Sequence, residues 1–322
     1  MDDKFLHEYR RDPDPPFARE LQERLRRQEG VRVSRPIVPL IAAACAVAVI
    51  TVIFTVPSVR VSAQALLDIF RVRRFAAVEL KQSRLEALRS LDKERGFLVF
   101  DRQEKLVDPG PARYLPSRDA ASSQVGFTVS APGYLPDGMS PDSVFVEGEG
   151  RMRLSVSEAQ LRSLLDRLDL RDVSVPPGLD GRWIEVQKPP VVIQRFRSRG
   201  RQAALVEARS PVVSVPAGWD VERLAEIGLR VLGLDSGEAR RIAHATDWRS
   251  TLLVPVPMDA STFRQITVRG QPGLLITTTD RPSADGHKRQ GVVLMWTEGD
   301  RVFCLQGNVT GPEIVQMAES IS

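Results

Sequence analysis

Histidine and cysteine are scarce in this chain of 322 residues, which has three histidines and two cysteines. His7, His244 and His287 are far apart, and no two of them have the spacing of metal ligands. Cys45 lies in a long apolar run, so a disulfide with Cys304 is not expected. Cys304 itself stands among apolar residues and is predicted to be a small buried side chain rather than a reactive thiol.

Sequence motifs of catalysis are also missing. The chain has no Gly-x-Ser-x-Gly elbow, no phosphate-binding Walker loop, no His-Glu-x-x-His and no dinucleotide-binding glycine pattern. We therefore expect a protein that is not an enzyme and binds no cofactor. The net charge of +4 comes from mixed signs among 27% charged residues, so binding to nucleic acid is not expected either.

Charge is absent from residues 36–59. Their core, 38–56, consists mainly of Val, Ile, Ala, Leu and Phe, and a helix rising about 1.5 Å per residue would carry it across a hydrocarbon layer of about 30 Å. The sequence thus predicts one transmembrane helix at 36–59.

The basic residues around this run predict its orientation, because Lys and Arg resist transfer across the membrane. Five arginines shortly precede the run and two follow it: Arg24, Arg26, Arg27, Arg32 and Arg35, then Arg60 and Arg71. We expect a single-pass protein of the inner, cytoplasmic membrane with residues 1–35 in the cytoplasm and the large C-terminal part outside it. Three alternatives are a signal peptide cleaved near 61–65, a lipoprotein anchored at Cys45, and a buried core helix.

The predicted cytoplasmic tail, residues 1–35, contains one amphipathic stretch. Phe17, Leu21 and Leu25 recur at every fourth position and would form one apolar stripe on a helix. A lone short helix is marginal in water, so we expect this stripe to bind a partner helix. A membrane surface, or no specific role, is the alternative.

Residues 60–95 are predicted to form a juxtamembrane helical linker. Arg71, Arg73 and Arg74 would then lie beside the lipid headgroups of the bilayer. The linker either relays a signal or simply connects two parts of the chain.

Residues 96–322 are predicted to form an extracytoplasmic α+β domain, as one unit or as two subdomains. Helices are expected over 157–170, which begins with a capping box of Ser157 and Gln160, and over two stretches that begin near Asp220 and Ser236. Five runs of strand character precede or separate these helices: 97–101, 125–130, 143–148, 182–187 and 191–196.

The C-terminal segment, about 246–322, has the clearest pattern. Four strands joined by short connections predict an antiparallel meander: 263–270, 274–279, 292–297 and 301–307. A last helix follows, with Thr310 and Glu313 as its capping box and Pro312 in its first turn.

Two further sets of residues allow either a functional or a structural interpretation. Four alternating arginines would share one face as a contact for anionic lipid or an acidic partner, or would protect a solvated sheet edge: Arg195, Arg197, Arg199 and Arg201. Four tryptophans would line an apolar groove or belong to the core: Trp183, Trp219, Trp248 and Trp296.

Two segments resemble a family of bacterial extracytoplasmic domains of unknown function that follow the membrane span of anti-sigma-factor-like proteins. The first is the C-terminal pattern of Trp296, Phe303, Gly307 and the Ala-Glu-Ser at 318–320, and the second is the Tyr-Leu-Pro stretch within 131–138. The resemblance implies an RseB-like or lipoprotein-carrier-like architecture, in which a curved antiparallel sheet is packed against helices.

The resemblance also implies a role. It suggests a membrane-anchored sensor or binding protein that acts as a regulator of anti-sigma-factor type. The implied cytoplasmic partner is a sigma factor or another regulator, and the implied ligand on the other side is an envelope lipid or protein. The chain lacks the family's multi-helix cytoplasmic domain and its His-x3-Cys-x2-Cys motif, so sigma-factor capture would rest on the Phe17, Leu21 and Leu25 helix alone. A membrane-tethered carrier or chaperone for lipid or polypeptide, without signalling, is the alternative function.

Overall fold

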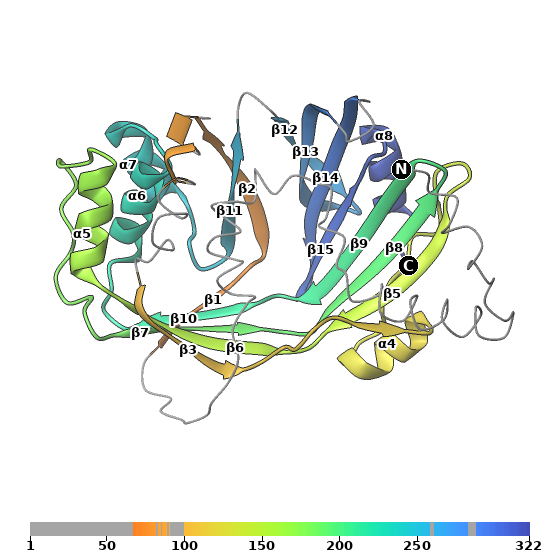
Figure 1. Ribbon diagram of the computed structural model, residues 1–322, viewed down its shortest axis with the longest axis horizontal. Coiled ribbons are helices and arrows are strands. Elements are labelled where there is room, and N and C mark those ends of the chain that lie inside the picture. Colours follow the sequence, from red (N-terminus) through yellow and green to blue (C-terminus); the bar gives the residue numbers. More distant parts are fainter. Residues whose placement is uncertain are drawn as a thin grey trace, which may run out of the picture. The chain divides into compact units, whose positions relative to one another are not determined.

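The computed structural model of the protein describes residues 67–81, 83–84, 86–88, 90, 100–257, 261–282 and 288–322. These residues are mostly β: fifteen strands form three sheets (Figure 1). The predicted α+β class is therefore corrected to a mainly β architecture with a minority of helices.

The first sheet has five strands, and all neighbouring strands in it are antiparallel. Their spatial order is β1 (Leu67–Arg71), β10 (Val212–Pro216), β7 (Trp183–Lys188), β6 (Gly150–Val156) and β3 (Phe100–Val107).

The second sheet has eight strands, again antiparallel throughout. Their order is β12 (Ser261–Val268), β13 (Gln271–Pro282), β14 (Lys288–Glu298), β15 (Arg301–Gly307), β9 (Arg201–Arg209), β8 (Val191–Ser198), β5 (Ser140–Glu147) and β4 (Arg113–Leu115). The predicted C-terminal meander is confirmed, since β12 to β15 pair consecutively. Its first turn lies at Arg269 and Gly270, both with positive φ, rather than at 271–273.

Three strands of the second sheet are joined to strands of the first by links of a few residues. β5 leads into β6, β7 into β8, and β9 into β10, and Figure 1 shows the members of each pair following one another. At one of these links Lys188 is buried, and its Nζ lies 2.5 Å from Oε1 of Glu147. Burial lowers the pKa of Lys188, against the opposing effect of Glu147. The pair ties the end of β7 to the end of β5.

The third sheet is a parallel ribbon of two strands, β2 (Arg74–Leu80) and β11 (Thr251–Pro257). One face of the ribbon packs through Phe75 and Val254 on Leu274 and Ile276 of β13. The other face packs on helices through Val78. Burial on both faces is what a parallel pair requires, so the sequence of β2 shows no simple alternation.

The main helices of the described residues are α4 (Arg118–Val125), α5 (Glu158–Arg167), α6 (Val221–Val231), α7 (Ser236–Ala245) and α8 (Gly311–Glu319). α8 packs on the second sheet, where Ile314 and Met317 join Trp296 and Phe303 in the largest core cluster. α5 and α6 contribute to a separate cluster with the first sheet, and α6 and α7 cover the outer face of the ribbon. The caps expected at Ser157, Asp220 and Thr310 are all present.

The predicted helical linker at 60–95 is wrong over residues 67–80, which form β1 and β2. β1 pairs with β10 and β2 with β11, so partners far along the chain decide their conformation. Tertiary pairing overrides a local pattern that suits a helix. Residues 83–84, 86–88 and 90 are helical.

The membrane prediction also needs correction. Among the residues that the structure describes, no helix is both long and apolar enough to cross a bilayer. The run at 36–59, the tail at 1–35 and the stripe of Phe17, Leu21 and Leu25 lie outside the described residues. The single-pass inner-membrane localisation finds no support in the structure and is withdrawn.

Glu313 provides a stability test at the start of α8. Its carboxylate accepts from the amide of Thr310 at 2.8 Å and pairs with Arg201 at 2.5 Å, and these contacts, led by Arg201, lower its pKa to about 2. A carboxylate with a lowered pKa stabilises the fold above its ordinary pKa, and the contribution is lost as the pH falls toward 2. Glu313→Gln is expected to lower stability at pH 7 and to lose less stability than the wild type between pH 5 and pH 3.

Urea unfolding at these pH values measures the effect. Glu238→Gln is the matched control, because Glu238 occupies the same third position of α7 and no described arginine pairs with it. At pH 7, Glu238→Gln should lower the free energy of unfolding less than Glu313→Gln does. Equal acid sensitivity of the wild type and Glu313→Gln would contradict the assignment.

Candidate functional site

The β1–β2 turn and the loop between α7 and β11 are joined by backbone hydrogen bonds. The amide of Arg71 donates to the carbonyl of Arg249 at 2.9 Å. The amides of Arg73 and Arg74 both donate to the carbonyl of Ser250, at 2.8 and 3.1 Å. Two segments far apart in the sequence are thereby held side by side.

Asp247 orders the second of these segments. Its carboxylate accepts from the Ser250 hydroxyl at 2.5 Å and from the Arg249 amide at 3.1 Å. The Ser250 hydroxyl is the main reason that the pKa of Asp247 lies below its ordinary value, and the Arg249 amide and the charges of Arg74 and Arg249 act in the same direction. Asp247 therefore remains ionised and keeps the loop in one conformation.

Side chains of the two segments line an open cavity of about 510 Å³. Its lining residues are Arg71, Arg73, Asp247, Arg249 and Ser250, and we call this cavity the arginine pocket. Three arginines and one aspartate line it, which leaves an excess of positive charge. Arginine presents a planar fork of donors that matches carboxylate and phosphate groups, so the pocket can hold an anion.

The arginine pocket contains two of the three arginines predicted to contact a surface. Arg71 and Arg73 line it, whereas Nε of Arg74 donates to the Thr251 hydroxyl at 2.7 Å outside the lining. Sequence reasoning missed Arg249 and Asp247, because they come from a loop far along the chain. No local spacing could have joined them to Arg71.

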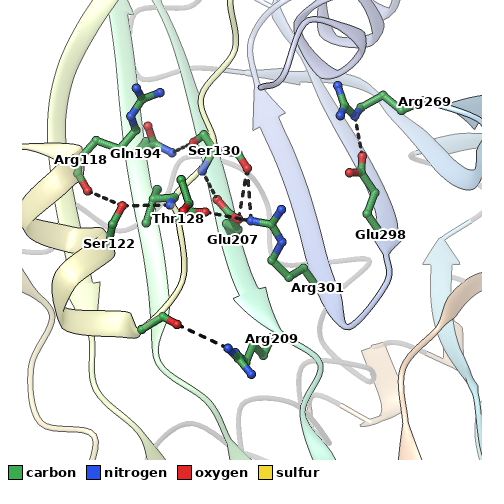
Figure 2. A network of polar contacts seen from close by, with 12 residues as sticks. Arg118, Ser122, Thr128, Ser130, Gln194, Glu207, Arg209, Arg269, Glu298 and Arg301 are labelled. Carbon is green, nitrogen blue, oxygen red and sulfur yellow. Dashed lines mark hydrogen bonds and ion pairs between the residues drawn. The ribbon is translucent and has the colours of Figure 1, made fainter.

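A second polar cluster lies around Glu207 of β9, and Figure 2 shows how its members point toward one another. The Glu207 carboxylate accepts from Nη1 of Arg301 at 2.5 Å and from the amide of Ser130 at 2.9 Å. Gln194 donates to the carbonyl of Ser130 at 2.6 Å, and Arg301 donates to the carbonyl of Thr128 at 3.0 Å. The cluster fastens residues 128–130 to the second sheet.

This second cluster is closed to ligands. Glu207 has a relative exposure of 0%, and Gln194 and Ser130 are also buried. Burial raises the pKa of Glu207, although the Ser130 amide and Arg301 act against the rise. The polar groups satisfy one another, so we assign the cluster to stability.

Metal binding and thiol chemistry gain no support from the described residues. Within them no group of His, Cys, Asp or Glu side chains has a metal-binding arrangement. Cys304 is half-buried in β15, and burial raises the pKa of its thiol to about 12. That thiol stays protonated and unreactive at neutral pH.

The alternating arginines do not protect a sheet edge, because β8 lies between β9 and β5. Arg195 stacks 4.7 Å from the ring centre of Phe145, Arg197 pairs with Asp142 at 3.5 Å, and Arg201 pairs with Glu313.

The tryptophans line no common groove. Trp296 is buried and stacks on Phe303 with ring centres 5.0 Å apart, whereas Trp183 contacts Arg153. Trp219 is buried in the cluster of α5 and α6.

The two segments that carried the family resemblance meet in space. Pro132 forms a bridge with Ile321, and the amides of Gly133 and Tyr134 donate to Ser320, each at 2.9 Å. The Tyr-Leu-Pro segment thus anchors the end of α8. Both motifs are structural, and neither reaches the arginine pocket.

Comparisons with known proteins give little further information. No protein-family model matches the chain, and no curated protein matches its sequence. Among solved structures, a crystal structure of MucB in complex with MucA(peri) is 10% identical over 63% of this chain and 95% of that chain, with a TM-score of 0.10. A TM-score this low does not indicate a common fold.

Proposed function

We propose that the described part of the chain is a binding module rather than an enzyme, and that it recognises an anionic group in the arginine pocket. The observation that carries this proposal is the convergence of Arg71, Arg73 and Arg249 on one open cavity. The backbone bonds between the turn and the loop fix the positions from which these side chains extend. Such preorganisation lowers the cost of binding.

Binding without catalysis is consistent with a sensor or regulatory role, which the sequence suggested. Anion binding that moves the turn at the arginine pocket would also move the ends of β1 and β2, because the turn that carries Arg71 and Arg73 joins these strands. β1 belongs to the first sheet, and β2 packs on the second. An anion bound at the turn is thus placed to affect both sheets.

A carrier for polypeptide is the second candidate function. The observation in its favour is a half-buried apolar strip on the second sheet, formed by Ile193, Val206 and Cys304. A lipid groove between sheet and helices is less favoured, because the side chains of α5 and α6 pack directly with the first sheet.

Titration of the full-length chain with small anions tests the proposed function. We expect inorganic phosphate or triglutamate to bind, and Arg71→Gln, Arg73→Gln or Arg249→Gln to weaken binding about tenfold or more each. The reason is that a hydrogen bond to a charged group contributes about 1.5–3 kcal/mol, and 1.4 kcal/mol corresponds to a tenfold change. Isothermal titration calorimetry measures these affinities.

Arg113→Gln is the matched control, because Arg113 is exposed on β4 and lies outside the pocket lining. Its affinity should equal that of the wild type. Binding should also weaken as salt is added, since exposed charges are screened. An affinity that the three pocket substitutions leave unchanged, or no binding of either anion, would refute the proposal.

A further inference from the structure

One edge of β2 has no described partner strand. β2 pairs with β11 on one side, and no other described strand pairs with it. An edge strand presents a row of unpaired amide and carbonyl groups, which makes it a template for an added strand. Parallel sheets that end at two strands are unusual, because parallel pairs normally lie inside larger sheets.

The free edge of β2 is directed toward β15 and β9. The ribbon lies over the second sheet with β11 against β12 and β2 against β13 and β14. Since the sheet order continues from β14 to β15 and β9, those strands lie beyond β2. The β1–β2 turn reaches the same region: Thr297, in β14, donates to the carbonyl of Arg73, and Ser210, directly after β9, donates to that of Val72 at 2.9 Å.

The surface beyond β2 is apolar and incompletely covered. Val206 of β9 is in register with Ile193 of β8 and with Cys304 of β15, so the three side chains form one strip across three strands. All three are half-buried, whereas their neighbours on the opposite face, such as Leu205 and Phe303, are fully buried. We call Ile193, Val206 and Cys304 the uncovered strip.

We propose that an extended segment of a partner polypeptide adds to the free edge of β2 as a third strand. Its apolar side chains lie on the uncovered strip, and an acidic side chain at one end enters the arginine pocket. This inference rests on the proposed function, because it uses the same pocket. A strand added to β2 would lie about 4.8 Å from it and would direct alternate side chains toward the second sheet.

Three observations favour a polypeptide over other occupants. The edge of β2 that lacks a described partner strand is matched by another backbone and not by an acyl chain. The uncovered strip offers an apolar surface to the side chains that an added strand directs toward the second sheet. The arginine pocket includes Arg73, which directly precedes the first residue of β2. A partner strand lying alongside β2 would therefore have one end near the pocket, where the arginines attract an acidic side chain.

A synthetic peptide provides the test on the full-length chain. The probe is a fluorescein-labelled peptide of two aspartates followed by alternating valine and threonine, ten residues in all. A second peptide has two lysines in place of the aspartates. A third is N-methylated at every residue of its valine–threonine part, so that neither of its edges can complete a strand ladder. We expect anisotropy to show binding of the first peptide, at least tenfold weaker binding of the second, and at least tenfold weaker binding of the third.

Variants of the protein locate the peptide. Ile193→Thr/Val206→Thr is expected to weaken its binding about tenfold, whereas Val144→Thr, on the opposite face beside α4, is the matched control. A benzophenone placed at a valine of the peptide should crosslink to residues 202–208 or 301–307, as mapped by mass spectrometry. The crosslink uses the unaltered protein and does not depend on the folding of any variant.

The outcomes separate this inference from the function on which it rests. Phosphate or triglutamate binding with no peptide binding leaves the proposed function intact and overturns the third strand. Equal binding of the N-methylated peptide, or crosslinks confined to other strands, overturns it as well, and so does peptide binding that Arg71→Gln leaves unchanged. Phosphatidylglycerol vesicles bound in place of the peptide, or a dimer that forms instead, would assign the surface to another occupant.

Discussion

Arg301→Ala is expected to destabilise the fold by about 3–5 kcal/mol, because it leaves the Glu207 carboxylate buried without its ion-pair partner. The cost comes from desolvation: Glu207 has a relative exposure of 0%, and the remaining contacts from Ser130 do not neutralise its charge. Denaturant unfolding at pH 7.5 measures the loss. Arg209→Ala is the matched control, because Arg209 faces Arg301 in register. Its guanidinium donates to the carbonyl of Gly126 at 3.5 Å (Figure 2) and forms an exposed pair with Asp300, which should contribute at most about 1 kcal/mol.

The same substitution has a predicted pH dependence. The pKa of Glu207 is already raised by burial, and removal of Arg301 raises it further. A carboxyl with a raised pKa stabilises the folded state fully below its unfolded pKa, and this contribution is lost as the pH rises through the folded value. The deficit of Arg301→Ala relative to the wild type should therefore be larger at pH 8 than at pH 4.5. A deficit that is constant with pH would show that Glu207 is not the group left unpaired.

Gly307→Ala is expected to destabilise the fold by about 3 kcal/mol, which should lower the Tm by about 6–12 °C. A Cβ at Gly307 would lie 2.5 Å from the carbonyl oxygen of Gln202 and 3.0 Å from the Cα of Ala203. Both are backbone atoms of β9, so β15 and β9 would have to separate. The amide of Asn308, which donates to the same carbonyl at 3.1 Å, would be displaced with them.

Gly228→Ala is the matched control and should have the opposite sign. Gly228 lies in α6 with no atom within 4 Å of an added Cβ, so alanine is expected to stabilise the helix by about 1 kcal/mol. Calorimetric Tm values for the two variants test both expectations. A Gly307→Ala protein as stable as the wild type would show that β15 can move away from β9 at little cost.

Local signals explain what the sequence predicted correctly. The four C-terminal strands follow one another with short connections, so neighbours in sequence are neighbours in the sheet. The caps at Ser157, Asp220 and Thr310 depend only on residues three positions away. Such patterns can be recognised without knowing what the element packs against.

Elements that depend on distant partners were missed. α4 has small and polar residues and only Ala121 and Val125 buried, so it lacks an apolar stripe, and its end was taken for a strand. The first strands were taken for a helix because β2 is buried on both faces. The arginine pocket was not predicted: Arg71 and Arg73 were named as contacts for lipid headgroups, and Arg249 comes from a segment that the ribbon brings near them.

The β2–β11 ribbon also bears on the order in which the protein folds. Thr251 is 177 residues from its contact Arg74, and the pair is parallel, so the ribbon closes a very long loop. Long-range parallel pairing is slow, because chain entropy is lost before contacts are gained. While the chain is being synthesised, β2 emerges long before β11 exists, with two apolar faces and both edges exposed. Among the described strands, β2 is separated from its partner by the longest stretch of chain, so it needs protection from aggregation until β11 has been synthesised.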